Sequence, residues 1–395
     1  MPQKRFIISV ILAALLSAVL LCLVGCQTVP DGDGNLSDES SSFPFVKTAS
    51  QEVIDVSAHS AILVEMQSGS VVYRKNADEK MAMASTTKIM TALVALENCE
   101  LSRVVTVSPE AVGVEGSSVY LFAGERITME DLLYALLLSS ANDAAAAIAI
   151  EVGGSIEGFA DMMNARAQTL GLENTHFTNP HGLYDDEHYT TARELAIIAR
   201  EAMAHEIFAK IVATYKKSAA MIGSDGARLF VNHNKLLKSY DGACGIKTGF
   251  TKKSGRCLVS CAERDGLQFL CVTLNAPDDW RDHAAMLDYG YSLYENKTLC
   301  LAGQLNFTLP VVSGDQACVQ ITNTDTLHLV MPRGADEPEC TIELPRFVFA
   351  DVRAGQIIGY AVYIIDGREV ARCPLVAQYS VTRINYKKGI FSLFG

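Results

Sequence analysis

Ser85 and Lys88 are the two residues in this sequence whose types and spacing most directly suggest catalysis. They stand three positions apart, where apolar residues at helical spacing begin with Ile89. Residues three apart share a helix face, so the hydroxyl would lie beside the amine. A serine hydroxyl needs a base to become a nucleophile, and a lysine can be that base only if burial or another cation lowers its pKa. The N-terminus of this helix would also offer N–H groups to an oxyanion.

Two further motifs follow in the chain, Ser140-Ala141-Asn142 and Lys247-Thr248-Gly249. Each is weak alone, because short polar triplets are common in surface turns. A Ser-x-x-Lys tetrad, a Ser-x-Asn type triplet and Lys-Thr-Gly in this order are typical of serine penicillin-binding enzymes and class A β-lactamases. The chain resembles the low-molecular-mass penicillin-binding proteins that are serine-type D-alanyl-D-alanine carboxypeptidases. The resemblance covers roughly residues 45 to 385.

This resemblance implies a role for each ionisable or hydroxyl group of the three motifs. Ser85 would be the acylated nucleophile, and Lys88 would be its general base. Ser140 would relay a proton toward the leaving nitrogen. Lys247 would keep that proton network charged and Lys88 neutral.

The same resemblance implies how the substrate is bound. Asn142 would hydrogen-bond a substrate amide, and Thr248 with Arg281 would bind the terminal carboxylate. The backbone N–H groups of the nucleophile and of Phe250 would form the oxyanion hole, with Gly249 in the same strand. The implied substrate is a peptidoglycan stem peptide ending in D-Ala-D-Ala, and β-lactams would be covalent inhibitors.

No cofactor and no metal are expected. No group of His, Cys and carboxylate residues has a recognisable metal-ligand spacing. His181, in a Pro/Gly-punctuated loop at 177–183, and His233 are interpreted as structural polar residues.

Three alternatives remain open beside the carboxypeptidase. A β-lactamase of the same fold is disfavoured, because no deacylating Glu-x-x-Leu-Asn segment lies between Ser140 and Lys247. An endopeptidase differs in pocket shape, which motifs do not reveal. A non-catalytic penicillin-binding sensor or module would not need all three motifs intact, and a sensor is expected to carry a signalling domain across the membrane. Only five residues precede the first apolar run, so no such domain is expected.

The elements that position these residues can be read from local patterns. Residues 60–65 form a strand whose hairpin returns at 71–73. Thr128 and Asp131 resemble a capping box that starts a helix through Leu137, and Ser140 and Asn142 lie in the loop after it. The segment 245–251 opens a strand, and 257–262 with 267–274 form a hairpin around Asp265-Gly266, a dipeptide typical of a type I′ turn.

These patterns predict an α/β serine β-lactamase/transpeptidase-like catalytic domain followed by a small all-β C-terminal domain. We place the catalytic penicillin-binding domain at residues 51–302 and the β domain at 303–384. In the second region short alternating runs at 318–321, 327–330, 356–364 and 375–381 are separated by Gly, Pro and Asp, as in all-β domains.

The eleven cysteines do not suggest a disulfide framework. With a two-residue turn at Asp265-Gly266, position 261 pairs with 270 and position 260 with 271. Cys261 and Cys271 then point to opposite faces of the sheet and cannot bond to each other. Most of the other cysteines are expected to be small buried apolar residues.

Both ends of the chain suggest contact with a membrane. Residues 1–26 resemble a lipoprotein signal in which Cys26 becomes lipidated, or alternatively an uncleaved anchor. Residues 27–50 would be a flexible linker. The protein would be extracytoplasmic, anchored through its N-terminus at the outer face of the cytoplasmic membrane. The tail 385–395 combines Lys387 and Lys388 with apolar residues and could be an interfacial segment or the frayed end of a strand.

The overall charge argues against nucleic acid as a partner. The formal net charge is −12 and the sequence pI is about 5.2.

Overall fold

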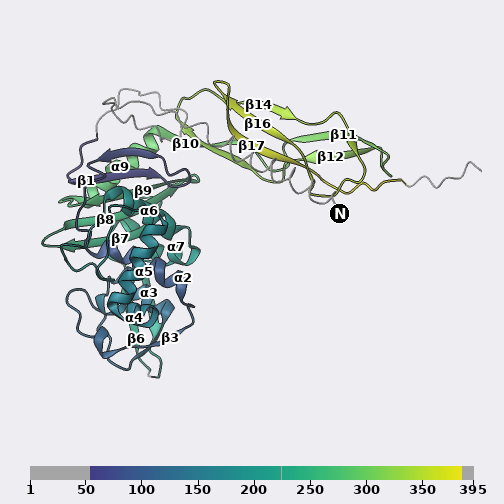
Figure 1. Ribbon diagram of the computed structural model, residues 1–395. Helices are drawn as coiled ribbons and strands as arrows, with labels where there is room; N and C mark the ends of the chain where they lie inside the picture. The colour runs from purple at the N-terminus through teal and green to yellow at the C-terminus, as the bar shows by residue number, and fades with distance from the viewer. Residues whose placement is uncertain (1–53, 224, 385–395) are drawn as a thin grey trace, which may run out of the picture. The chain divides into compact units, whose positions relative to one another are not determined.

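The computed structural model describes residues 54–223 and 225–384 (Figure 1). The segments interpreted above as signal, linker and C-terminal tail lie outside the described residues, and so does Cys26. Within the described residues no helix is both long enough and apolar enough to cross a bilayer.

An antiparallel sheet of five strands forms the centre of the first part of the chain. Its strand order is β2-β1-β9-β8-β7. The strands are β1 Ser60–Glu65, β2 Val71–Lys75, β7 Ala243–Thr251, β8 Gly255–Arg264 and β9 Leu267–Leu274. Two short pairs accompany it, β3 Val104–Thr106 with β4 Arg126–Thr128, and β5 Lys216–Ala220 with β6 Ala227–Val231.

Helices cover both faces of this sheet (Figure 1). The bounds are η1 Ala84–Thr87, α2 Lys88–Asn98, η2 Pro109–Ala111, α3 Met129–Leu138, α4 Asn142–Gly153, α5 Ile156–Thr169, α6 Ala192–Met203, α7 Glu206–Ala213, α8 Leu236–Ser239 and α9 Asp279–Leu293. Alternate strand residues face opposite sides. Ile62 of β1 belongs to the core that includes residues of α2 to α7, whereas Leu63 belongs to the core that includes Met286 and Leu287 of α9. This is the α/β catalytic fold that the sequence predicted.

Local sequence signals account for several element boundaries. Thr128 caps α3 by accepting a hydrogen bond from Asp131 N at 3.1 Å, and its hydroxyl donates to Asp131 Oδ2 at 2.8 Å, so the predicted start of this helix is confirmed. Asp265 and Gly266 both have positive φ (53° and 73°), as a type I′ turn requires, and the predicted hairpin register is confirmed. One boundary differs: Asn142 is the first residue of α4 rather than part of the preceding loop.

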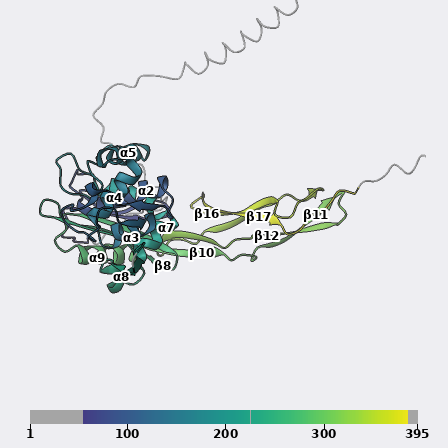
Figure 2. The ribbon, with the colours of Figure 1, turned by 90° about the horizontal axis from the view of Figure 1, so that it is seen from below.

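The second part of the chain is all β, also as predicted. A six-stranded sheet has the order β14-β16-β17-β12-β11-β15, and β10 pairs with β13. The bounds are β10 Tyr294–Cys300, β11 Asn306–Val312, β12 Cys318–Thr322, β13 Leu327–Pro332, β14 Glu339–Glu343, β15 Val348–Phe349, β16 Ile357–Ile365 and β17 Arg368–Ala377. Strands β11, β12, β16 and β17 run side by side with no helix between them (Figure 2). The hydrophobic core of this all-β part includes Val319, Ile321 and Leu375.

The predicted run at 375–381 is wrong in its bounds. The strand β17 begins at Arg368 and ends at Ala377, because its pairing with β16 begins beside the turn at Asp366-Gly367. Both turn residues have positive φ, which is the geometry of a tight hairpin.

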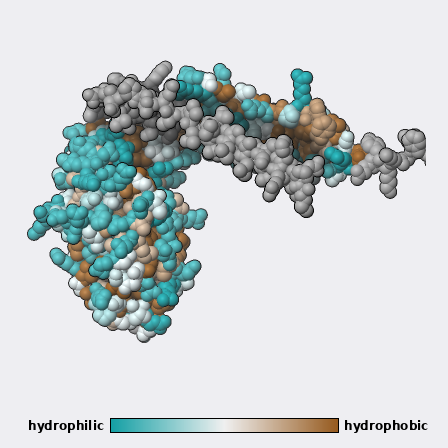
Figure 3. Space-filling view, in the orientation of Figure 1, coloured by the Kyte–Doolittle hydropathy of each residue, from teal (hydrophilic) through white to brown (hydrophobic). Residues whose placement is uncertain are grey.

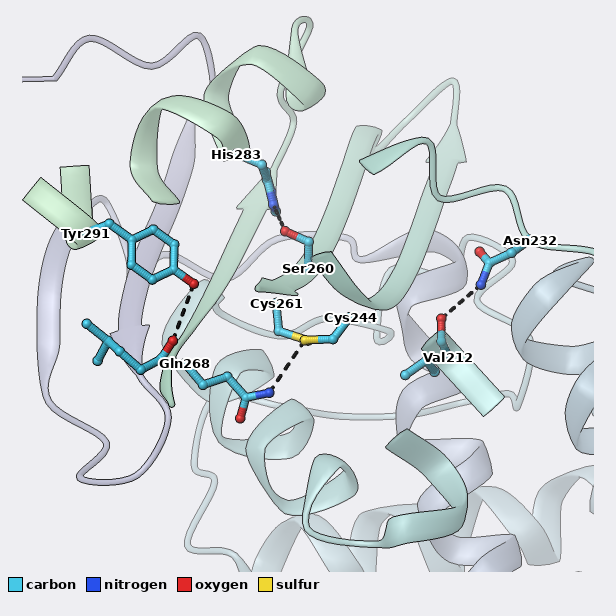
Figure 4. The surroundings of a disulfide bond; sticks show 9 residues. Val212, Asn232, Cys244, Ser260, Cys261, Gln268, His283 and Tyr291 are labelled. Carbon is cyan, nitrogen blue, oxygen red and sulfur yellow. Dashed lines mark hydrogen bonds between the residues drawn. A yellow bond between two sulfur atoms is a disulfide. The ribbon is translucent and has the colours of Figure 1, made fainter. Parts of the chain in front are cut away.

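One disulfide is present among the described residues, which the cysteine spacing did not suggest. Cys244 of β7 is bonded to Cys261 of β8 with a Cα–Cα distance of 5.5 Å (Figure 4). The register of the two strands shifts between Ala243 and Gly245, so Cys244 is the extra residue of a β-bulge and reaches its neighbour. Cys257 and Cys271 are buried and unbonded, as expected.

Candidate active site

Ser85 lies in a turn that immediately precedes helix α2. The sequence predicted that Ser85 would open an α-helix, but residues Ala84–Thr87 form the 3₁₀ turn η1, and α2 begins at Lys88. Ala84 has a φ of 47°, a strained conformation for alanine, and Thr87 Oγ1 donates to Ala84 O at 2.8 Å. The turn therefore holds the serine in a fixed position at the head of α2.

The side-chain amine of Lys88 is within hydrogen-bond distance of that serine hydroxyl. Its Nζ lies 2.9 Å from Ser85 Oγ and donates to Asn142 Oδ1 at 2.7 Å and to His181 O at 2.6 Å. The side chain is completely buried. Burial, and then the charge of Lys247, lower the pKa of Lys88 well below its usual value. A neutral lysine amine in this position can accept the proton of Ser85.

Ser140 and Lys247 form a second hydroxyl–amine pair. Lys247 Nζ donates to Ser140 Oγ at 3.0 Å and to Thr248 O at 2.9 Å. Burial lowers the pKa of Lys247 to about 7. Ser140 is held at a φ of 58° in the turn between α3 and α4. The Ser140 and Lys247 motifs, whose two residues are 107 positions apart in the chain, are thus joined by a side-chain hydrogen bond.

Asn142 links the first pair to a neighbouring loop. It accepts from Lys88, and its Nδ2 donates to Glu115 O. Its side chain is nearly fully buried at the N-terminus of α4. The amide predicted to bind substrate is therefore one of the groups that orient Lys88.

The strand β7 passes directly beside the Ser85 turn. A Cβ added at Gly249 would lie 3.1 Å from Ser85 N and 3.2 Å from Met83 O, so only glycine allows this approach without a shift. Thr248 is half-buried in β7, and the side chain of Phe250 is 65% exposed. The backbone of β7 next to Ser85 N is where the predicted oxyanion hole would form.

Among the described residues, Arg281 makes no hydrogen bond or ion pair with the residues of the three motifs. It lies in the first turn of α9, its side chain is 70% exposed, and its Nη1 is 3.8 Å from Asp278 Oδ2. Its role in binding a carboxylate stays a prediction.

One functional group was missed by sequence reasoning, the backbone carbonyl of His181. It accepts from Lys88, and Thr91 Oγ1 donates to Pro180 O at 2.6 Å. A Cβ on Gly182 would lie 1.9 Å from Ala84 O, so the loop 177–183 packs tightly on the nucleophile turn. The Pro/Gly punctuation marked a loop, but a carbonyl contact leaves no signal in residue types. Burial lowers the pKa of the His181 ring to about 3.

Among the described residues no group of three or more His, Cys, Asp and Glu side chains could hold a metal ion. His233 has a pKa below its usual value because of burial and the nearby charge of Lys247. Its backbone N donates to Leu138 O at 3.3 Å, which fits a structural role.

The antiparallel sheet with helices on both faces and the Ser–Lys pair at the head of α2 define the class of serine penicillin-binding enzymes. A model of the D-alanyl-D-alanine carboxypeptidase family (peptidase family S11) matches residues 46–278, and one of the penicillin-binding protein 5 C-terminal domain matches residues 294–383. The chain belongs to this family and is a low-molecular-mass, serine-type D-alanyl-D-alanine carboxypeptidase.

Individual relatives agree with this assignment. The chain is 32% identical over 339 residues to the D-alanyl-D-alanine carboxypeptidase DacF of Bacillus subtilis, covering 83% of this chain and 87% of the relative. Penicillin binding protein 5 of Haemophilus influenzae has a TM-score of 0.60 at 28% identity, covering 84% of this chain and 99% of its own. The Streptomyces K15 DD-transpeptidase has a TM-score of 0.58 at 33% identity, covering 61% and 99%.

Proposed function

We propose that this enzyme removes the terminal D-Ala from peptidoglycan stem peptides through an acyl intermediate on Ser85, and that penicillin acylates the same oxygen. The observation that carries the proposal is the 2.9 Å contact between Ser85 Oγ and the Lys88 amine, whose pKa is held well below its usual value. An amine whose pKa is lowered in this way is more often neutral and can take the hydroxyl proton.

The other residues of the site are assigned to the remaining steps of the reaction. Ser85 Oγ attacks the carbonyl of the penultimate D-Ala while Lys88 takes the proton. The backbone N–H groups of Ser85 and Phe250 stabilise the oxyanion. Ser140 passes a proton to the leaving D-Ala nitrogen, and Lys247 donates to Ser140 in turn. Water then hydrolyses the acyl-enzyme and restores Ser85.

Recognition of the free terminus is assigned to Thr248 and Arg281. The guanidinium of Arg281 and the hydroxyl of Thr248 would pair with the D-Ala carboxylate. A site built to pair with a charged group rejects a neutral analogue strongly. The proposal therefore includes discrimination against a C-terminal amide.

Labelling with a fluorescent penicillin tests the nucleophile. Ser85→Ala should abolish labelling while the protein remains folded by circular dichroism. Lys88→Ala should slow acylation by ~10² to 10⁴-fold, the usual contribution of a general base. A folded Ser85→Ala protein that is labelled at the wild-type rate would exclude Ser85 as the acylated residue.

We also propose that the protein acts outside the cytoplasm, held to the outer face of the cytoplasmic membrane by a lipid on Cys26. The support is the sequence Leu23-Val24-Gly25-Cys26 at the end of an apolar run. Intact mass of protein extracted from membranes decides this. A mass that starts at Cys26 with acyl chains is expected, and an N-terminus at Met1 or after Cys26 would refute the lipid anchor.

A further inference from the structure

A loop at residues 115–122 lies against the substrate-binding end of α4. Asn142 N donates to Ser117 O at 2.7 Å, and Asn142 Nδ2 donates to Glu115 O. Gly116 has a φ of 98°, and a Cβ there would lie 2.8 Å from Asn142 Nδ2. The loop backbone is therefore in direct contact with the residue that orients Lys88.

The inner side of this loop is fixed by the carboxylate of Asp143, which is almost completely buried. Asp143 accepts from Ser118 Oγ at 2.7 Å, from Leu121 N at 2.9 Å and from Val119 N at 3.3 Å. Hydrogen bonds to a charged acceptor are stronger than those between neutral groups. The segment on either side of Tyr120 is thus tied to the second residue of α4.

The outer side is fixed by an ion pair between a half-buried arginine and a buried glutamate. Arg228 of β6 donates to both carboxylate oxygens of Glu125, at 2.8 and 2.6 Å, and Glu125 is 5% exposed. The same guanidinium donates to Tyr120 O at 3.1 Å and to Val119 O. A bidentate arginine gives direction as well as attraction. The loop is held from both sides.

The hydrogen bonds to Asp143 and Arg228 hold the backbone around Tyr120, whose side chain is exposed. Its φ is 58°, a conformation that non-glycine residues rarely adopt, and it is 84% exposed. A tyrosine that served the core would be buried. Strained backbone with a dedicated hydrogen-bond network and an exposed aromatic ring, next to catalytic groups, is typical of a binding surface.

We propose that Tyr120 is a specificity-determining residue whose ring packs on the part of the stem peptide that precedes D-Ala-D-Ala. This rests on the proposed function. The terminal carboxylate would lie at Thr248 of β7 and the scissile carbonyl at Ser85, and Asn142 would bind the amide beyond it. A peptide bound in this order would bring the residue before D-Ala-D-Ala to the loop 115–122. There the ring of Tyr120 would pack against a long aliphatic side chain of that residue.

Two substrates with the same scissile bond test the proposal. The first is diacetyl-L-lysyl-D-alanyl-D-alanine, which carries an aliphatic side chain before D-Ala-D-Ala, and the second is acetyl-D-alanyl-D-alanine. In the full-length protein, Tyr120→Ala should lower kcat/KM for the first about 5- to 30-fold, mainly through KM, since a contact kept from ground state to transition state changes KM. The second substrate should change less than about twofold.

Two further variants separate this role from a structural one. Tyr120→Phe keeps the ring and should behave like wild type. Phe122→Ala removes another exposed ring of the same loop (53% exposed) and is the matched control, with both substrates expected unchanged. An equal loss on both substrates, or no loss on either, would overturn the assignment of Tyr120. Wild-type protein that releases no D-Ala from either substrate would instead contradict the proposed function.

Discussion

Lys88 and Lys247 are buried lysines whose side-chain amines lie within hydrogen-bond distance of Ser85 and Ser140, respectively. Burying a charge is unfavourable, so the fold holds these amines with reduced proton affinity. This arrangement is costly for stability and useful for chemistry, since a neutral lysine is a base.

The titration of Lys247 gives a prediction about stability. In the unfolded chain a lysine keeps its proton to about pH 10.4, whereas in the folded protein the pKa of Lys247 is about 7. Between these values the unfolded state binds more protons, so raising the pH stabilises the folded protein. Lys247→Met lacks this gain. Its free energy of unfolding relative to wild type should therefore fall by ~1–4 kcal/mol from pH 6.5 to 9.5.

Denaturant unfolding at a series of pH values measures this difference. Lys252→Met, which removes an exposed lysine just after β7, is the control for loss of a positive charge. The quantity to follow is the free energy of unfolding of Lys247→Met minus that of wild type. If this quantity stays constant or rises with pH, the charged form of Lys247 is not destabilised by burial.

The polar residues of the site could be named from sequence because three motifs occur in a fixed order. The structure brings Ser85, Lys88, Ser140 and Lys247 into two hydrogen-bonded pairs as the resemblance implied. The carbonyl of His181 could not be named, since every residue has a carbonyl and only the path of the loop decides which one faces Lys88.

At the scale of elements, strand β7 matters most, because it carries Lys247, Thr248 and Gly249 past the Ser85 turn. The disulfide between Cys244 and Cys261 ties β7 to β8 three residues before Lys247 (Figure 4). Gln268 Nε2 lies 3.5 Å from the Cys244 sulfur. The bridge therefore fixes the start of the catalytic strand.

Removing this bridge should destabilise the catalytic part of the molecule. The two cysteines are 17 residues apart, and closing a loop of about that length contributes ~3 kcal/mol. Cys244→Ala with Cys261→Ala should lower the unfolding midpoint in urea under non-reducing conditions. Cys318→Ala, which removes an unbonded cysteine, is the control. Equal midpoints for wild type and the double variant would mean that the bridge does not stabilise the fold.

Sequence predicted the hairpins and the helix cap well because turn dipeptides and caps act locally. It missed the disulfide because the bulge at Cys244 changes which residues of β7 and β8 are neighbours, and regular alternation does not reveal a bulge. It also missed the 3₁₀ turn at Ser85. That turn is set by the loop 177–183 and by β7, which are far away in the chain.

At the scale of the whole molecule, the described residues end on the β domain at Ile384, whose N donates to Ser313 O at 2.9 Å. Nearby, Val312 of β11 pairs with Phe349 of β15, and both are exposed (40% and 64%). Hydrophobic surface is visible over β11 (Figure 3). Phe347 stacks edge-on against Phe349 with a centroid distance of 5.4 Å. Exposed aromatic rings on this part of the β domain suit the surface of a bilayer, and the sequence that follows Ile384 contains two lysines.

We therefore predict that the tail contributes to membrane binding. Protein starting after Ser50 should co-sediment with anionic vesicles, and deletion of residues 385–395 should reduce the bound fraction. Neutral vesicles are the control, because attraction by Lys387 and Lys388 requires anionic lipid. Equal co-sedimentation of both forms would rule out a contribution from the tail.

The two-part organisation was predictable from the change from mixed to purely alternating patterns near the end of α9. The fold of each part follows from hydrophobic periodicity. The conformation of the loop 115–122 could not be predicted, because it is set by an ion pair and by hydrogen bonds from distant residues rather than by periodicity.

The central claim is that Ser85, activated by Lys88, hydrolyses the last peptide bond of a D-Ala-D-Ala terminus. The most direct measurement is quantitative product analysis of a stem peptide ending in D-Ala-D-Ala and of its C-terminal amide, with wild type and Ser85→Ala. We expect wild type to release one free D-Ala per free-acid peptide, to cleave the amide far more slowly, and Ser85→Ala to release none. Release of D-Ala by folded Ser85→Ala at the wild-type rate, or no release of D-Ala from the free-acid peptide by wild type, would contradict the account.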